Sequence, residues 1–131
     1  YTDNIMKTFI ITLLLALSLP LVSQSYVLKA SYLAVTDGNK FKESYVNIKM
    51  YLDGDAQRLV IDSKVRQIID YDILRQYVDK DNYTVYECTA TDSNYKYIGV
   101  KFLFSNPDSA VIVSITYNNL AYSYLCERQR R

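Results

Sequence analysis

The chain has 131 residues, a formal net charge of +1 and no histidine. The absence of histidine excludes Ser-His-Asp and Cys-His catalysis, histidine-based zinc sites and a histidine pH switch. Acidic and basic residues are interspersed without a basic stripe, so we do not expect nucleic acid as a partner. The three glycines, Gly38, Gly54 and Gly99, are isolated and form neither a phosphate-binding loop nor a dinucleotide fingerprint. We therefore expect no cofactor and no metal ion.

Residues 6–25, MKTFIITLLLALSLPLVSQS, follow the order of a secretory signal peptide: a positive charge, an apolar stretch and then small residues. The apolar stretch is shorter than the run of about 20 residues that a membrane-spanning helix needs. We interpret Met6 as the initiator and 1–25 as an upstream stub plus a signal peptide that is cleaved after Ser25. The expected product is a single secreted or periplasmic domain, 26–131, with no stable membrane anchor.

From residue 26 onward, apolar and aromatic runs alternate with turn residues, which is typical of successive β-strands. In chain order, the predicted strands cover 26–36, 44–52, 57–63, 65–71, 83–91, 95–104, 110–117 and 120–127. In the second and sixth of these strands the alternation places four apolar residues on one face, which we expect to point inward. These residues are Val46, Ile48, Met50 and Leu52, and Ile98, Val100, Phe102 and Phe104.

The segment KVRQIIDYDILRQYV, residues 64–78, fits two patterns. Its second half could form one helical face, with Asp72 as the N-cap. Its first half has the β-branched and aromatic residues of a strand. We predict a strand over 65–71 and a looser segment that turns helically after it.

Eight short strands at even spacing, most of them joined by hairpin-length turns, predict an all-β fold with an antiparallel meander. Eight strands can close into a small barrel, which removes exposed edges, so we predict a closed or partly open barrel. A two-sheet β-sandwich is the alternative.

Three stretches, RLVIDSKVRQIIDY, DKDNYTVYECTATD and SITYNNLAYSYL, carry a resemblance to a known group. With them, most of the chain after residue 25 resembles small exported β proteins of gut Bacteroidetes and their phages. The shared features are strand patterns, not site signatures. No activity is assigned to that group, so the resemblance implies a fold and no function.

Cys88 and Cys126 are the two cysteines. An even number of cysteines in an exported chain favours a disulfide between them, since the compartment is oxidising. The alternative is a pair of buried thiols. We predict the disulfide.

Tyrosine is the most unusual feature of the composition: the chain has 14 tyrosines and no tryptophan. Tyr45, Tyr51, Tyr95 and Tyr97 lie opposite the apolar faces of their strands. Exposed tyrosines on a rigid sheet make good contacts with sugars or proteins, because they supply a large area at low entropic cost. We predict that these four are exposed contact residues and that some form one patch. Cross-strand pairing for stability is the alternative role.

Carboxylates could still support acid–base catalysis, as in glycosidases, and the candidates are Asp70, Asp72, Glu87 and Asp92. We interpret these four as surface or turn residues and assign no catalytic residue. The Asp79-Lys80-Asp81-Asn82 run fails the EF-hand pattern, because its sixth and twelfth positions are Thr84 and Ala90. We interpret this run as a solvated turn, with a looser calcium site at Asp79, Asp81 and Asn82 as the alternative.

The sequence therefore predicts a small exported, non-enzymatic β domain that binds an unidentified ligand or protein partner. One alternative is a protein inhibitor or surface-interaction factor, and a second is a small hydrolase that uses carboxylates. A hollow in the barrel would favour the ligand-binding domain. A filled interior with a flat tyrosine patch outside would favour the inhibitor or surface-interaction factor. Two carboxyl groups that face each other in a cleft would favour the hydrolase.

Overall fold

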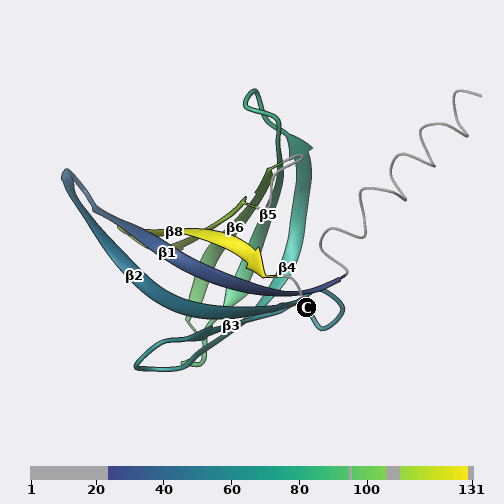
Figure 1. Ribbon diagram of the computed structural model, residues 1–131, viewed down its shortest axis with the longest axis horizontal. Coiled ribbons are helices and arrows are strands. Elements are labelled where there is room, and N and C mark those ends of the chain that lie inside the picture. Colours follow the sequence, from purple (N-terminus) through teal and green to yellow (C-terminus); the bar gives the residue numbers. More distant parts are fainter. Residues whose placement is uncertain (1–23, 95, 106–109, 130–131) are drawn as a thin grey trace, which may run out of the picture.

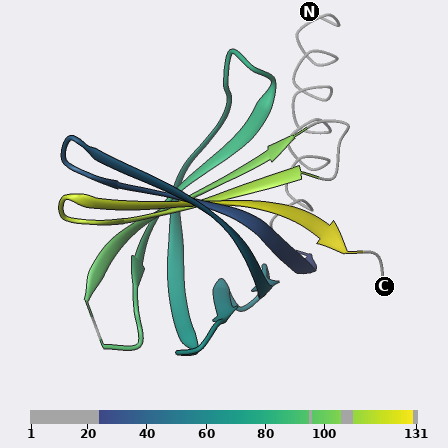
Figure 2. The same ribbon diagram turned by 60° about the vertical axis from the view of Figure 1, so that its left-hand side comes forward.

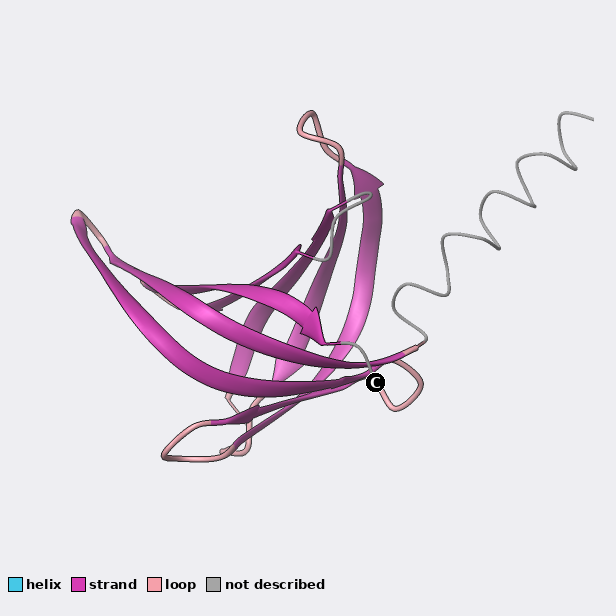
Figure 3. Ribbon diagram, viewed as in Figure 1, coloured by secondary structure: helices cyan, strands magenta, loops and turns pink. Residues whose placement is uncertain are grey.

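The computed structural model describes residues 24–94, 96–105 and 110–129. Within these ranges the chain forms eight β-strands and no helix (Figures 1 and 3). In chain order the strands are β1 (Ser25–Asp37), β2 (Lys40–Asp53), β3 (Arg58–Asp62), β4 (Gln67–Val78), β5 (Tyr83–Thr91), β6 (Tyr97–Ser105), β7 (Ala110–Tyr117) and β8 (Leu120–Gln129). Each of the eight predicted strands is present.

Every strand pairs antiparallel with the next, and β1 pairs with β8, so the sheet closes into a barrel. The closing ladder is long, running from Val27 opposite Gln129 to Asp37 opposite Leu120. The predicted eight-stranded antiparallel barrel is therefore confirmed, and the sandwich alternative is wrong.

The alternation along the strands separates an apolar interior from a polar exterior. In β2, Met50 and Leu52 are buried while Tyr45 and Lys49 on the opposite face are exposed. The buried core cluster contains Leu28, Ala30, Met50, Leu52, Leu59, Ile61, Ile69, Tyr71, Tyr86, Cys88, Ala90, Ile98, Val100, Phe102, Phe104, Val111, Val113, Ile115, Tyr124 and Cys126. The two inward faces predicted from the sequence are confirmed, although Val46 and Ile48 are only partly buried against the core.

The predicted helical turn after residue 71 is wrong, because β4 continues as a strand to Val78. Its ladder with β5 runs from Asp70 opposite Thr91 to Val78 opposite Thr84. A β-bulge inserts Leu74 between Ile73 and Arg75. An inserted residue switches which positions face inward, so the inward position after Ile73 is Gln76, opposite the buried Tyr86.

The turns between β1 and β2, β3 and β4, β5 and β6, and β7 and β8 lie at one end of the barrel, because successive strands alternate in direction. We call this end the mouth end. There the β1–β2 and β7–β8 hairpins project side by side (Figure 2), joined by the pairing of Asp37 with Leu120. The start of β1, the end of β8 and the β2–β3 turn lie at the opposite end.

The predicted signal segment falls on residues that the structure does not describe, except for Gln24 and Ser25. These two residues already belong to the sheet region: β1 begins at Ser25, and the Gly54 N–H donates to the Gln24 carbonyl at 3.1 Å. Among the described residues, none forms a helix long and apolar enough to cross a membrane.

The predicted disulfide between Cys88 and Cys126 is not formed, and both cysteines are buried free thiols. Strands β6 and β7 lie between β5 and β8, and the ladder from Cys88 passes through Val100 and Ile115 to Tyr122. Tyr122 is four residues from Cys126, about 13 Å along a strand. The two thiols are thus separated both around the barrel and along it. Each sulfur instead lies 3.8 Å from the backbone carbonyl two residues earlier.

We expect Cys88 and Cys126 to stay reduced and unreactive in the folded protein. Burial raises the pKa of each thiol to about 12, so neither supplies the reactive thiolate at neutral pH. A thiol reagent should label no cysteine in native buffer and both cysteines in denaturant, as measured by intact mass. The mass of an oxidised pair in protein recovered from an oxidising compartment would contradict this expectation.

Aromatic rings fill the centre of the barrel. The ring of Tyr71 packs on Phe102 with centroids 5.0 Å apart, and Tyr86 packs edge-on against Phe104 at 5.6 Å. The Tyr71 hydroxyl, however, is buried and has no hydrogen-bond partner among the described residues. Burial of an unpaired hydroxyl costs about 1–3 kcal/mol.

The Tyr71→Phe variant should therefore be as stable as the wild type or more stable, since the substitution keeps the ring contacts and removes the unpaired group. Urea denaturation measures the change in unfolding free energy. We expect a gain of up to about 1 kcal/mol. A loss of that size would instead reveal a partner of the hydroxyl, such as a trapped water molecule.

Candidate functional site

A hollow of about 390 Å³ opens at the mouth end of the barrel. Its lining residues come from β4, β7, β8 and the β5–β6 turn: Gln67, Asp92, Lys96, Ile115, Tyr117, Leu120, Tyr122 and Tyr124. Small-molecule sites typically measure about 300–1,000 Å³, and barrel mouths are among the places where they occur. The mouth is therefore the candidate site.

Three tyrosines form the aromatic wall of the mouth, because the alternation of β7 and β8 turns them inward. Tyr117 shares a face with the buried Ile115, and Tyr122 and Tyr124 share one with the buried Cys126. The rings of Tyr117 and Tyr122 meet edge to face, with centroids 6.0 Å apart. Burial raises the pKa of both Tyr117 and Tyr124, so these hydroxyls remain neutral hydrogen-bonding groups.

The β5–β6 turn supplies the charges of the mouth. Asp92 Oδ1 accepts hydrogen bonds from the backbone N–H groups of Asn94 at 2.9 Å and Lys96 at 3.0 Å. The Asp92 N–H donates in turn to the Lys96 carbonyl at 3.1 Å. These bonds hold the Asp92 carboxylate in place, and its charge adds to burial in raising the pKa of Tyr117. Lys96 brings a positive charge, so the lining carries one charge of each sign.

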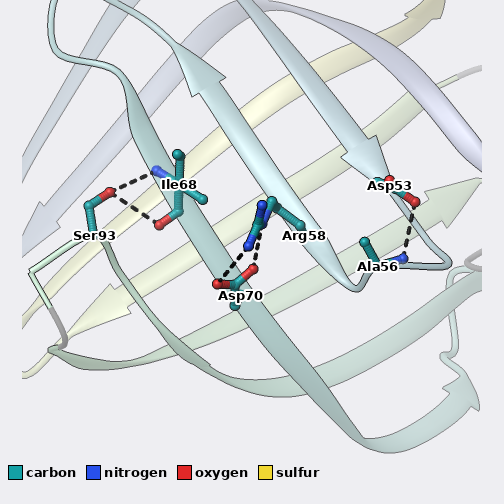
Figure 4. A network of polar contacts seen from close by, with 6 residues as sticks. All are labelled: Asp53, Ala56, Arg58, Ile68, Asp70 and Ser93. Carbon is teal, nitrogen blue, oxygen red and sulfur yellow. Dashed lines mark hydrogen bonds and ion pairs between the residues drawn. The ribbon is translucent and has the colours of Figure 1, made fainter.

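Ser93 fastens the same turn to the start of β4, beside Gln67. Its hydroxyl oxygen accepts a hydrogen bond from the Ile68 N–H at 3.0 Å, and its O–H donates to the Ile68 carbonyl at 3.3 Å (Figure 4). The backbone N–H and C=O groups of Ile68 thus have hydrogen-bond partners in Ser93, although the β4–β5 ladder begins only at Asp70. The polar lining residues are thus held on a braced turn.

Three of the four tyrosines predicted as contact residues lie within the described residues, and all three are exposed. Tyr45 and Tyr97 are each 90% exposed and Tyr51 is 41% exposed, as the alternation predicts. Tyr95 lies outside the described residues. Tyr45 is on β2 and Tyr97 on β6, four strands away and so on the opposite side of the barrel. Tyr45 and Tyr97 therefore do not belong to one patch.

Three of the four candidate carboxylates lie on the outer face of β4 and β5, and the fourth lies at the mouth. Asp70 pairs with Arg58 on the neighbouring strand at 2.7 Å (Figure 4), and both side chains are exposed. Asp72 is exposed on the same face of β4. Glu87 binds Arg75 at 3.2 Å and accepts from the Tyr77 hydroxyl at 2.9 Å, and that hydroxyl is the main reason the pKa of Glu87 is lowered. Asp92 is the candidate that lines the mouth.

In two turns, an aspartate side chain accepts hydrogen bonds from backbone N–H groups of the same turn. Asp79 Oδ1 accepts from the N–H groups of Asp81 and Tyr83, each at 2.9 Å, and Asp53 Oδ1 accepts from the Ala56 N–H at 3.1 Å (Figure 4). Across residues 24–94, 96–105 and 110–129, no group of three or more potential metal ligands is found. Asp79 thus has the turn role predicted from the sequence.

Most of the mouth was missed by the sequence reasoning, which singled out Asp92 alone among the lining residues. The signal lay in SITYNNLAYSYL, where Tyr117, Tyr122 and Tyr124 fall on the inward face around one tight turn. Alternation could have shown that they point inward. It could not have shown that the barrel is hollow at their level.

No family model, no curated protein and no solved structure matches the chain.

The Asp92→Ala variant should loosen the rim of the mouth, because two backbone N–H groups lose their acceptor. We expect a loss of about 1–2 kcal/mol in unfolding free energy. Faster amide exchange should appear at Asn94 and Lys96. Asp92→Asn keeps an acceptor oxygen and should retain most of the stability, whereas equal losses in both variants would mean that the charge, not the hydrogen bonds, holds the turn.

Proposed function

We propose that this protein is an exported, non-enzymatic β-barrel that binds a neutral, ring-containing ligand of the carbohydrate class in its mouth. The observation that carries the proposal is the convergence of three tyrosines with Gln67, Asp92 and Lys96 around a hollow of about 390 Å³. Export rests on the order of charged, apolar and small residues in 6–25.

The aromatic wall supports a ligand with flat apolar faces. Tyrosine rings offer such faces together with a hydroxyl group at the wet edge of the site. They also have few rotatable bonds, so ligand binding orders them at low entropic cost. The C–H faces of a pyranose ring fit this surface, and its hydroxyl groups fit the polar side chains beside it.

The polar lining supports a neutral ligand. Gln67 can donate and accept, the Asp92 carboxylate accepts and the Lys96 ammonium donates. A cation would meet the like charge of Lys96, and an anion would meet that of Asp92. A polyhydroxylated neutral ligand can use both charges as hydrogen-bonding partners.

The distribution of carboxylates does not favour the hydrolase alternative. Glycosidases place two carboxyl groups on either side of the scissile bond. Of the described residues that line the mouth, Asp92 is the one carboxylate, and Asp70 and Glu87 are paired with arginines on the outer face.

A protein-directed surface is the second candidate function. Tyr45 meets Tyr32 edge to face on the outside of the barrel, with centroids 5.8 Å apart. Leu125, which is opposite Tyr32 in the β1–β8 ladder, is 44% exposed. These three side chains form a small apolar surface that a partner could cover.

To test the mouth, the protein can be titrated with glucose, galactose, mannose and N-acetylglucosamine while backbone amide NMR shifts are recorded. We expect at least one sugar to shift amides of the β5–β6 turn and the β7–β8 hairpin. Tyr122→Ala should weaken that binding about tenfold, equivalent to about 1.4 kcal/mol.

Tyr45→Ser is the matched control, since it removes an exposed tyrosine on the outside of the barrel. The control should leave sugar affinity unchanged. Shifts centred on Tyr32 and Tyr45, or no shifts at the mouth with any of the four sugars, would overturn the proposed function.

A further inference from the structure

A second hollow, of about 350 Å³, lies on the outer face of the barrel across β5, β6 and β7. We call it the outer trough. Its lining consists of Leu74, Glu87, Cys88, Gly99, Val100, Lys101, Ser114 and Thr116. The ladder places Gly99 opposite Thr116 and Lys101 opposite Ser114, so the floor follows the outward positions of two paired strands.

The fold does not require a glycine at position 99. Gly99 lies within β6 and has no positive φ, and an added Cβ would meet only the Thr116 Cβ, at an ordinary distance of 3.8 Å. Glycine within a strand reduces stability, because it loses more backbone freedom on folding and packs no side chain. Such a position often marks a place where a ligand approaches closely.

The bulge in β4 contributes to the same hollow. Leu74 is the inserted residue and is 69% exposed, yet it lines the outer trough. Bulges re-aim side chains next to functional sites. The glycine in β6 and the bulge in β4 are separate departures from regular strands, and both shape one hollow.

The outer trough and the mouth lie on opposite faces of one wall. In β7, Ile115 lines the mouth and the next residue, Thr116, lines the trough. In β6, Gly99 forms the trough floor, and Lys96, just before the strand, lines the mouth. Tyr97 stands at the rim between Lys96 and Gly99 and is 90% exposed.

We propose that the outer trough is a second subsite for the same ligand, so that the ligand is a neutral oligosaccharide that runs from the mouth over Tyr97 into the trough. This inference rests on the proposed function of the mouth. Tyr97 would offer a ring to one sugar unit at the rim, and Gly99 leaves room for the next unit.

The chemistry of the trough matches that of the mouth. Leu74 and the open floor at Gly99 are apolar, and Ser114 and Thr116 bring hydroxyl groups. Glu87 and Lys101, 3.8 Å apart, supply opposite charges. As in the mouth, paired charges and hydroxyl groups beside an apolar surface favour a neutral polyhydroxylated ligand over an ion.

The dependence of binding affinity on the length of the oligosaccharide tests this proposal. Affinities are measured by calorimetry for monomers to hexamers of three neutral series: β-1,4-linked glucose, α-1,4-linked glucose and β-1,4-linked N-acetylglucosamine. If both subsites are filled, the hexamer of the series that binds should bind at least about tenfold more tightly than its monomer, because the second contact is intramolecular.

Gly99→Thr fills the trough floor, and Tyr97→Ser removes the rim ring. Each variant should abolish the gain with chain length while monomer affinity stays unchanged. Gly99→Thr should also keep or raise the melting temperature, because threonine suits a strand and the added Cβ has room. Tyr45→Ser, which removes a tyrosine of equal exposure on the other side of the barrel, should keep the gain.

The two proposals fail differently. Equal affinities for monomer and hexamer, with monomer shifts at the mouth, would overturn the second subsite and leave the mouth site standing. A length gain that survives in both Gly99→Thr and Tyr97→Ser would also overturn the second subsite. No binding by any member of the three series would overturn the second subsite, and the mouth site would fall with it if galactose and mannose also caused no amide shifts at the mouth.

Discussion

The pairing of β1 with β8 is the constraint on which the rest of the structure depends. It converts a meander with two open edges into a barrel, and an open edge would invite pairing with other chains. β1 meets this demand with an irregularity at Ser31, where the register shifts in both of its ladders. Ser31 is an extra residue relative to β8, whereas β2 has one more residue than β1 between the flanking pairs. This irregularity switches the inward positions from Leu28 and Ala30 to Leu33, whose side chain packs against the core. Closure also fixes which side chains share the interior, and therefore which of them can form a site.

The filling of that interior explains why the hollow lies at one end. Phe102, Phe104 and Met50 are fully buried and occupy the centre and the end away from the mouth. Near the mouth the inward positions of β7 and β8 carry tyrosines, whose rings can be buried while their hydroxyl groups reach water. A large side chain with a polar tip lines an opening without closing it. The turn that carries Asp92 is braced by Ser93, so the polar groups of the mouth stand on a rigid scaffold, as an effective binding site requires.

The sequence predicted the strands, their inward faces and the barrel, because a period of two is a local property of each strand. It did not predict features that depend on how distant strands meet. The bulge at Leu74 changed the phase of β4, so this strand does not keep a period of two along its length. Cys88 and Cys126 both point inward, but their separation depends on the register of three ladders. Tyr45 and Tyr97 are exposed as predicted, yet the curvature of the closed sheet places them on opposite sides. The mouth was missed for the same reason: its residues come from four parts of the chain that only closure brings together.

Three irregularities interrupt the strands of the barrel: the register shift at Ser31, the bulge at Leu74 and the glycine at position 99. They have different causes. The register shift at Ser31 serves closure, since it occurs in the ladders with both neighbours of β1. The insertion at Leu74 and the glycine at position 99 lie away from that seam, and at position 99 no clash requires a glycine. Both reduce the regularity of their strands, and the glycine also lowers the stability of β6. Sequences tend to keep such local costs where a site requires them. Their meeting at one hollow, on the wall that also forms the mouth, is the physical reason for our proposal that β6 and β7 form a binding wall.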